Sequence, residues 1–159
     1  MKNKEKIYSI AASLLIADQL IKLLVKSKMT LFDRIDVIPK FFSIYYIEND
    51  GAAFSIFGGK KIFLILVGII ALVFLDIFIT KEDNFNKMDI WCYGMVISGI
   101  IGNLIDRCLY GRVIDYLSFN IFGYSFPIFN FADIMIVVGV LLLIVSIIKN
   151  EKVKRDEGV

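Results

Sequence analysis

The chain has 159 residues, of which 58% are hydrophobic and 21% are charged, and its mean hydropathy is positive. Such a composition leaves too few polar side chains to cover a folded surface in water, which excludes an ordinary soluble domain and indicates an integral membrane protein. The formal net charge is only +2, and no basic stripe interleaved with aromatic residues occurs. We therefore expect no nucleic-acid partner.

The sequence contains no histidine and only two cysteines, Cys92 and Cys108. The lack of histidine excludes Ser-His-Asp and Cys-His sites and removes the usual zinc ligand. The two cysteines lie in or beside one apolar segment, with neither a metal-ligand spacing nor a disulfide framework, so we interpret them as packing residues. We expect chemistry that requires no metal and no cofactor.

Four apolar stretches approach the length that crosses a hydrocarbon core about 30 Å thick. They cover about residues 7–25, 62–79, 88–105 and 129–148. The first stretch is longer than a signal-peptide core and no small-residue cleavage site follows it, so we interpret it as a retained helix. This predicts an all-α integral membrane protein with one membrane-embedded domain, residues 1–159, and two outer loops, residues 26–61 and 106–128.

Four crossings place both termini on one side of the membrane. Nine Lys and Arg residues lie in the two tails and the short loop between the second and third stretches, against eight in the longer outer loops. The density of basic residues is therefore higher in the tails and the short loop. Because basic segments stay on the inner side, we expect both termini in the cytoplasm.

The first outer loop is long enough to carry structure of its own. Residues 35–47 are rich in β-branched and aromatic side chains and are followed by the turn signal Asn49-Asp50-Gly51. This pattern predicts a short sheet on the membrane surface. Residues 52–57 fit either a return strand or a brief amphipathic helix.

Several polar residues interrupt the predicted spans. Asp18 and Lys22 are four residues apart, so they share one helix face and can form an ion pair, which has either a purely structural role or a supporting one. Gly99, Asn103 and Arg107 recur at the same interval in the third stretch. Helix packing explains Gly99 and Asn103 equally well, and Arg107 also fits an interfacial residue whose charge reaches water.

Two aspartates lie at the outer ends of spans. Asp115 follows the third span in an apolar loop, Val113-Ile114-Asp115-Tyr116, where it can be a turn carboxylate that faces water. Asp133 enters the fourth span three residues after Asn130, a spacing that helix capping alone explains.

Together the two aspartates suggest a catalytic pair. Asp115 and Asp133 face each other if the third and fourth helices are antiparallel neighbours, as their short connection favours. Two close carboxyl groups do not both ionise easily, so one keeps a proton while the other is charged. Such a pair can activate water and protonate a leaving amide nitrogen. We expect Asp133, in the first turn of a helix, to be the more readily ionised member.

In five ordered blocks the chain resembles the lipoprotein signal peptidases (signal peptidase II) of bacteria. The blocks follow one another at family-like separations across nearly the full chain. They are Asp18-Gln19 with Lys22, Asn49-Asp50-Gly51-Ala52-Ala53-Phe54-Ser55, Gly102-Asn103-Leu104-Ile105-Asp106-Arg107, Val113-Ile114-Asp115-Tyr116, and Phe126-Pro127-Ile128-Phe129-Asn130-Phe131-Ala132-Asp133.

The resemblance implies a four-helix membrane aspartyl protease with a small extracytoplasmic β-sheet and a short surface helix. Its substrates would be diacylglyceryl-modified prolipoproteins, cut just before the lipidated cysteine, and globomycin-type inhibitors would block it. Asp115 and Asp133 match the catalytic pair. The matching binding and supporting positions are Asn49, Gly99, Asn103, Arg107, Asn130, Asp18 and Lys22.

The implied location is the bacterial cytoplasmic membrane, among membrane lipid, with the active site toward the extracytoplasmic face. We expect a monomer. A proton- or ion-coupled transporter is the chief alternative, because acids inside a membrane also mark conduction paths. Transport sites usually lie near the midplane, however, whereas these acids collect at one end. A scaffold held together by buried polar residues is the third interpretation.

Overall fold

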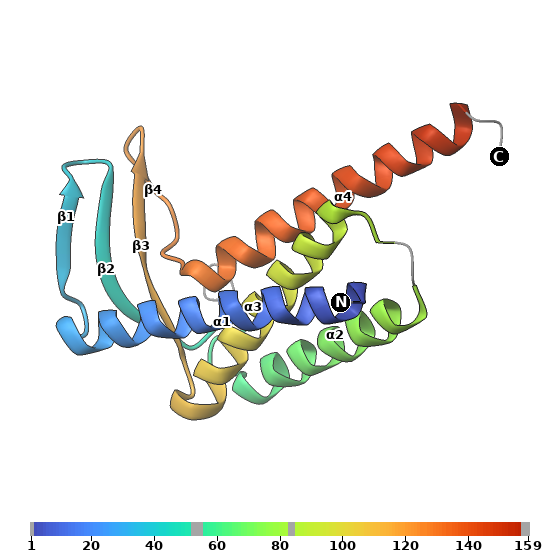
Figure 1. Ribbon diagram of the computed structural model, residues 1–159. Helices are drawn as coiled ribbons and strands as arrows, with labels where there is room; N and C mark the ends of the chain where they lie inside the picture. The colour runs from blue at the N-terminus through green and yellow to red at the C-terminus, as the bar shows by residue number, and fades with distance from the viewer. Residues whose placement is uncertain (1, 52–55, 83–84, 157–159) are drawn as a thin grey trace.

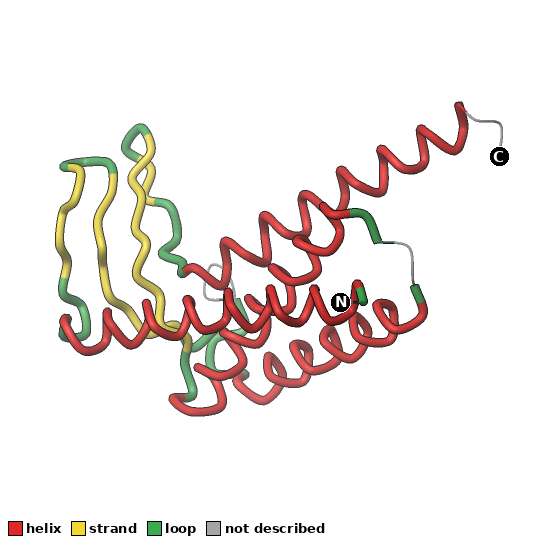
Figure 2. Tube along the Cα trace, in the orientation of Figure 1, coloured by secondary structure: helices red, strands yellow, loops and turns green. Residues whose placement is uncertain are grey.

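The structure is a computed structural model that describes residues 2–51, 56–82 and 85–156 (Figures 1 and 2). Four helices each contain a stretch long and apolar enough to cross a membrane, which confirms the four predicted membrane helices. The helices are α1 (Asn3–Lys28), α2 (Lys61–Lys81), α3 (Lys87–Tyr110) and α4 (Phe131–Asp156).

Helix α3 is the centre of the bundle, because both α1 and α4 pack against it. Its candidate span is 56% buried inside the protein, whereas that of α2 is only 6% buried. The sequences match these places. Helix α3 has the lowest hydropathy of the four and carries the small and polar residues that let helices approach, whereas the strongly apolar α2 leaves nearly all of its surface outside the protein interior.

The remaining elements form one antiparallel sheet in the order β1-β2-β3-β4. The first outer loop supplies β1 (Arg34–Ile38) and β2 (Phe42–Asn49), as expected, but β3 (Val113–Ile121) and β4 (Tyr124–Ser125) come from the second outer loop. The prediction that Asp115 lies in a loop is therefore wrong. It pairs with Ile47 in the middle of the sheet, a distant partner that local sequence patterns do not reveal.

The sheet lies at the end of the bundle where α1 and α3 end and where α2 and α4 begin (Figure 1). Val25 of α1 and Met29, the residue that follows the helix, pack there against Tyr46, Ile114 and Tyr116 of the two central strands. The first turn of α1 and the last turn of α4 lie at the opposite end (Figure 1). The sheet therefore covers the polar groups at the end of α3 and the start of α4.

The segment between β2 and α2 falls partly outside the described residues. Residues 56–59 form a turn, and residues 52–55 are not described, so the expected surface helix or return strand over 52–57 stays a prediction.

The interpretation of the cysteines is right for Cys92, which is buried, and wrong for Cys108, which is exposed near the end of α3.

Candidate active site

Helix α4 is tied to β3 immediately before its first turn. Phe129 accepts backbone hydrogen bonds from Tyr116 N–H (3.1 Å) and Leu117 N–H (2.8 Å), and its own N–H donates to the Leu117 carbonyl (3.2 Å). These bonds make a short bridge beside the sheet. As a result, the start of α4 lies next to Asp115 of β3.

A capping box starts α4. The Asp133 N–H donates to Asn130 Oδ1 (3.0 Å), and the Asn130 N–H donates to Asp133 Oδ2 (3.2 Å). The capping interpretation is therefore correct, and it explains why the helix begins at Phe131 rather than at Phe129 as predicted. Capping uses only part of each side chain, however, because both residues make further hydrogen bonds within the site.

Asp115 is only 1% exposed, so it is not a turn carboxylate that faces water. The Nδ2 atoms of Asn49 and Asn130 donate to its two oxygens, at 3.0 Å and 2.7 Å. The pairing of β2 with β3 brings Asn49 into reach, because Asn49 lies opposite Val113 at the end of the ladder. Asp115 is thus fixed by one neighbour from the sheet and one from the cap of α4.

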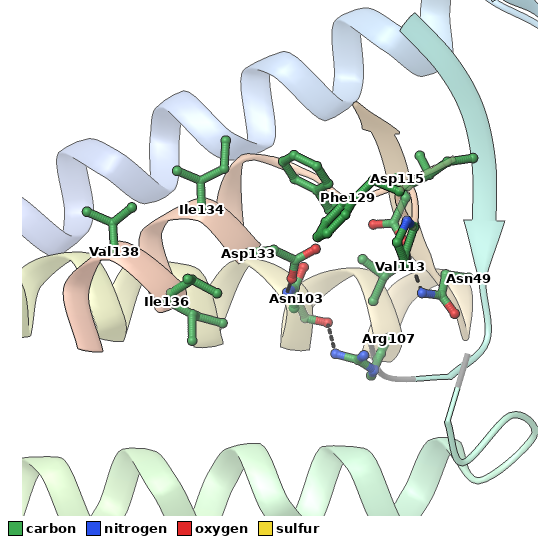
Figure 3. A pocket seen from close by; sticks show the side chains of 14 residues that line it. Asn49, Asn103, Arg107, Val113, Asp115, Phe129, Asp133, Ile134, Ile136 and Val138 are labelled. Carbon is green, nitrogen blue, oxygen red and sulfur yellow. Dashed lines mark hydrogen bonds between the residues drawn. The ribbon is translucent and has the colours of Figure 1, made fainter. Parts of the chain in front are cut away.

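Asp133 lies half-buried across the site from Asp115. Its Oδ1 accepts a hydrogen bond from Asn103 Nδ2 of α3 (2.7 Å), and its Oδ2 accepts the capping bond. All four oxygens of the two carboxyl groups therefore accept amide hydrogens. Figure 3 shows both carboxyl groups pointing toward one space between β3 and the antiparallel helices α3 and α4.

Both aspartates line one cavity of about 490 Å³. Asn49, Asn103 and Arg107 supply the rest of its polar wall. The remaining wall is apolar and consists of Val113, Phe126, Pro127, Ile128, Phe129, Ile134, Ile136, Val137 and Val138. The cavity thus places two acids at one end of an apolar surface that continues along α4.

Burial, reinforced by the nearby Asp133, raises the pKa of Asp115 to about 7, although the hydrogen bonds from Asn49 and Asn130 act in the opposite direction. Asp115 therefore keeps its proton close to neutral pH. A carboxylic acid of this kind is suited to donate a proton during a reaction.

A buried ion cluster lies behind the two aspartates. Lys22 Nζ lies 3.0 Å from Asp18 Oδ2, the predicted ion pair, and 2.9 Å from Asp106 Oδ2. It also donates to Asn103 Oδ1 (3.2 Å), which joins the cluster to the catalytic candidates. Asp106 received no role from the sequence, although its position three residues after Asn103, on the same helical face, placed it near the other polar residues.

Arg107 does not extend into water as an isolated interfacial residue. Its Nη2 donates to the carbonyl of Gly51 (2.9 Å), and its Nη1 donates to the carbonyl of Asn103 (3.4 Å; Figure 3). The guanidinium group therefore connects the segment that follows β2 to α3 at the edge of the cavity.

Gly99 does not line the cavity and lies at the contact between α3 and α4. A Cβ atom there would collide with the carbonyl oxygen of Ala132 and with the side chain of Ile136. The packing interpretation therefore accounts for Gly99.

Within residues 2–51, 56–82 and 85–156, no three His, Cys, Asp or Glu side chains are grouped as a metal-ligand set.

Residues 10–149 match the signal peptidase (SPase) II family. The chain belongs to the signal peptidase II family. Lipoprotein signal peptidase of Staphylococcus aureus is 39% identical over 97% of this chain and 98% of its own length, and that of strain JH9 is 38% identical with the same coverage. Membership makes this chain a membrane protease with bacterial relatives, which favours the protease over the transporter and the scaffold.

The fold matches that of solved bacterial membrane enzymes. One solved bacterial membrane enzyme is 37% identical and superposes with a TM-score of 0.87 over 96% of this chain and 93% of its own. A second is 38% identical, with a TM-score of 0.81 over 90% and 92%. The combination of four membrane helices and a small antiparallel sheet is therefore shared with solved enzymes.

Proposed function

We propose that this signal peptidase II is an aspartic endopeptidase that removes the signal peptide from diacylglyceryl-modified prolipoproteins, cutting just before the lipidated cysteine. Asp115 and Asp133 are the catalytic pair. The observation that carries this proposal is that both carboxyl groups, held by amide hydrogens on every oxygen, line one cavity with a long apolar wall.

The reaction needs one charged and one protonated carboxyl group. Asp133, as base, takes a proton from water while that water attacks the carbonyl carbon of the scissile peptide bond. Asp115, as acid, supplies its proton, and the carbon–nitrogen bond breaks once the leaving nitrogen is protonated. The raised pKa of Asp115 supports this division of roles, because the acid must hold its proton near neutral pH.

The supporting residues hold the reacting groups in place. Asn49 and Asn130 orient Asp115, and Asn103 orients Asp133. Asp18 and Lys22 support this arrangement from behind, and Gly99 lets α3 and α4 approach closely enough for it to form. Arg107, on the cavity wall, is suited to hold the substrate backbone or the charge that develops on it.

The apolar wall fits an apolar substrate. Ile134, Val137 and Val138 continue the cavity along α4, where a signal peptide and acyl chains can lie without leaving an apolar environment. Globomycin-type inhibitors would occupy the same cavity. No cofactor takes part in the proposed reaction, so a metal chelator should leave it unchanged.

The proposed setting is the bacterial cytoplasmic membrane, with the sheet and active site extracytoplasmic and both termini cytoplasmic. The separation of the sheet from the first turn of α1 and the last turn of α4 supports this orientation (Figure 1), as does the density of basic residues in the tails. Residues 1–159 act as one domain and as a monomer, with membrane lipid around α2.

The test uses the protein purified in detergent and a diacylglyceryl-modified prolipoprotein. Mass spectrometry should find the free signal peptide and a mature product that begins with the lipidated cysteine. The same prolipoprotein without the diacylglyceryl group is the control and should be cut much more slowly. Equal cleavage of both substrates, or a cut at another bond, would contradict the proposed specificity.

A further inference from the structure

The ammonium group of Lys22 has three N–H donors, and the site offers three acceptors. These are Asp18 Oδ2 (3.0 Å), Asp106 Oδ2 (2.9 Å) and Asn103 Oδ1 (3.2 Å). The side chains of Asp18, Lys22 and Asp106 are each at most 2% exposed, so water does not compete for these bonds. Across the described part of the chain, every buried side-chain nitrogen and oxygen has a hydrogen-bond partner.

This arrangement fixes which end of the Asn103 amide faces Asp133. An ammonium group donates and never accepts, so the oxygen of the amide must face Lys22. Asn130 Nδ2 donates to the same oxygen (3.2 Å). The amide nitrogen is then left to donate to Asp133 Oδ1 (2.7 Å), whereas a reversed amide would set donor against donor and oxygen against oxygen.

Asp106 keeps the ammonium group in this place. Its Oδ2 accepts from Lys22 on one side and from the Ile114 N–H (3.2 Å) on the other, so α1, α3 and β3 meet at one atom. Its Oδ1 also accepts from Gln19 (3.4 Å). Without Asp106, the only carboxylate bound to the Lys22 ammonium would be Asp18, which belongs to the same helix. Asn103 would then be the only group of α3 that binds the ammonium.

We propose that Asp106 is a positioning residue of the protease: it holds Lys22 so that Asn103 presents its N–H to Asp133. Asp106 lines no part of the cavity and acts only through its neighbours. This inference rests on the proposed function, because it assigns Asp106 to the same reaction.

A double-substitution cycle tests the proposal, with kcat and KM measured on a diacylglyceryl-modified prolipoprotein by the full-length proteins in detergent. Asp106→Ala should lower kcat roughly tenfold or more and change KM by less than about threefold, since the reacting groups lose their alignment while the substrate surface is intact. Asn103→Ala should lower kcat on its own. If Asp106 acts through Asn103, adding Asp106→Ala to Asn103→Ala should reduce kcat no further.

The proposal would be overturned if the loss of kcat in the double variant equalled the product of the two single losses. Asp106 would then affect kcat independently of Asn103. A folded Asp106→Ala protein with unchanged kcat would overturn it as well. Lack of cleavage by the unsubstituted protein would instead count against the proposed function, so the two failures are distinguishable.

If the Asp106→Ala protein does not fold, the Asp106→Asn protein tests whether Asp106 positions Lys22. This change retains a carbonyl oxygen that can accept from Lys22 and Ile114, so kcat should stay within about threefold of the unsubstituted value. Circular dichroism and the thermal unfolding midpoint in detergent establish that each protein is folded. A larger loss of kcat in the folded Asp106→Asn protein would overturn the proposal.

Discussion

At the scale of single residues, two opposing effects act on the protonation of Asp115. Burial favours its neutral form, whereas the amide groups of Asn49 and Asn130 favour its charged form. Burial has the larger effect, so the folded protein binds the proton of Asp115 more tightly than the unfolded chain does. A group of this kind links the free energy of unfolding to pH.

The sign of this linkage is the reverse of that for a salt-bridged aspartate. The pKa of Asp115 rises from its ordinary value of 3.8 to about 7 on folding, so its stabilising contribution is complete below about pH 4 and is lost as the pH rises through 7. At about 1.4 kcal/mol per pKa unit, the loss is on the order of 4 kcal/mol. The unfolding midpoint in detergent should therefore fall between pH 5 and pH 8.

Asp115→Asn should remove most of this fall, because an amide does not titrate in this range. Asp36→Asn is the matched control, since Asp36 is an exposed aspartate on β1 whose pKa is lowered by its bonds to Ser43 and Arg34. It should leave the fall between pH 5 and pH 8 intact. If the stability of the Asp115→Asn protein falls as steeply with pH as that of the unsubstituted protein, Asp115 is not the group that causes the fall.

At the scale of elements, the contact between α3 and α4 sets the geometry of the site, because Asn103 and Asp133 come from these two helices. Gly99→Ala should destabilise the protein by about 1 to 3 kcal/mol, as overpacking typically does. It should also lower kcat, since a Cβ at position 99 meets the backbone of Ala132 and pushes the helices apart. Unfolding in detergent and kcat measurements report the two effects.

Gly68→Ala is the control for that experiment. The three atoms nearest to a Cβ at position 68 all belong to the side chain of Leu104, the closest being its Cδ2 at 2.8 Å, and that side chain is able to turn away. Its effect on stability and kcat should be smaller than that of Gly99→Ala. Equal effects of the two substitutions would show that close approach of α3 and α4 is not required.

At the scale of the whole molecule, the two natural cysteines make the orientation testable. Cys108 is exposed near the end of α3 beside the sheet, whereas Cys92 is buried. A membrane-impermeant maleimide applied to intact cells should therefore label Cys108. In a Cys108→Ser background, Lys87→Cys, at the other end of α3, should be labelled only after the cells are permeabilised. The opposite pattern would reverse the proposed topology.

The sequence was most informative where the determinants of structure are local. Apolar length predicted the four helices, and the four-residue spacing of Asp18 and Lys22 predicted their ion pair. The strand that carries Asp115 was missed because its partner, β2, lies in the other outer loop. The spacing from Asn103 placed Asp106 near the site, but its role was not predicted because its bonds to Lys22 and Ile114 join elements that are distant along the chain.

The most direct test of the account replaces each catalytic candidate by its amide. Asp115→Asn and Asp133→Asn proteins should fold and bind a diacylglyceryl-modified prolipoprotein, yet kcat for signal-peptide release should fall by roughly a thousandfold or more, since each step needs a titratable group. Asp36→Asn, in the exposed strand β1, should keep full activity. Retention of more than about a tenth of the activity by either folded site variant would contradict a two-aspartate mechanism.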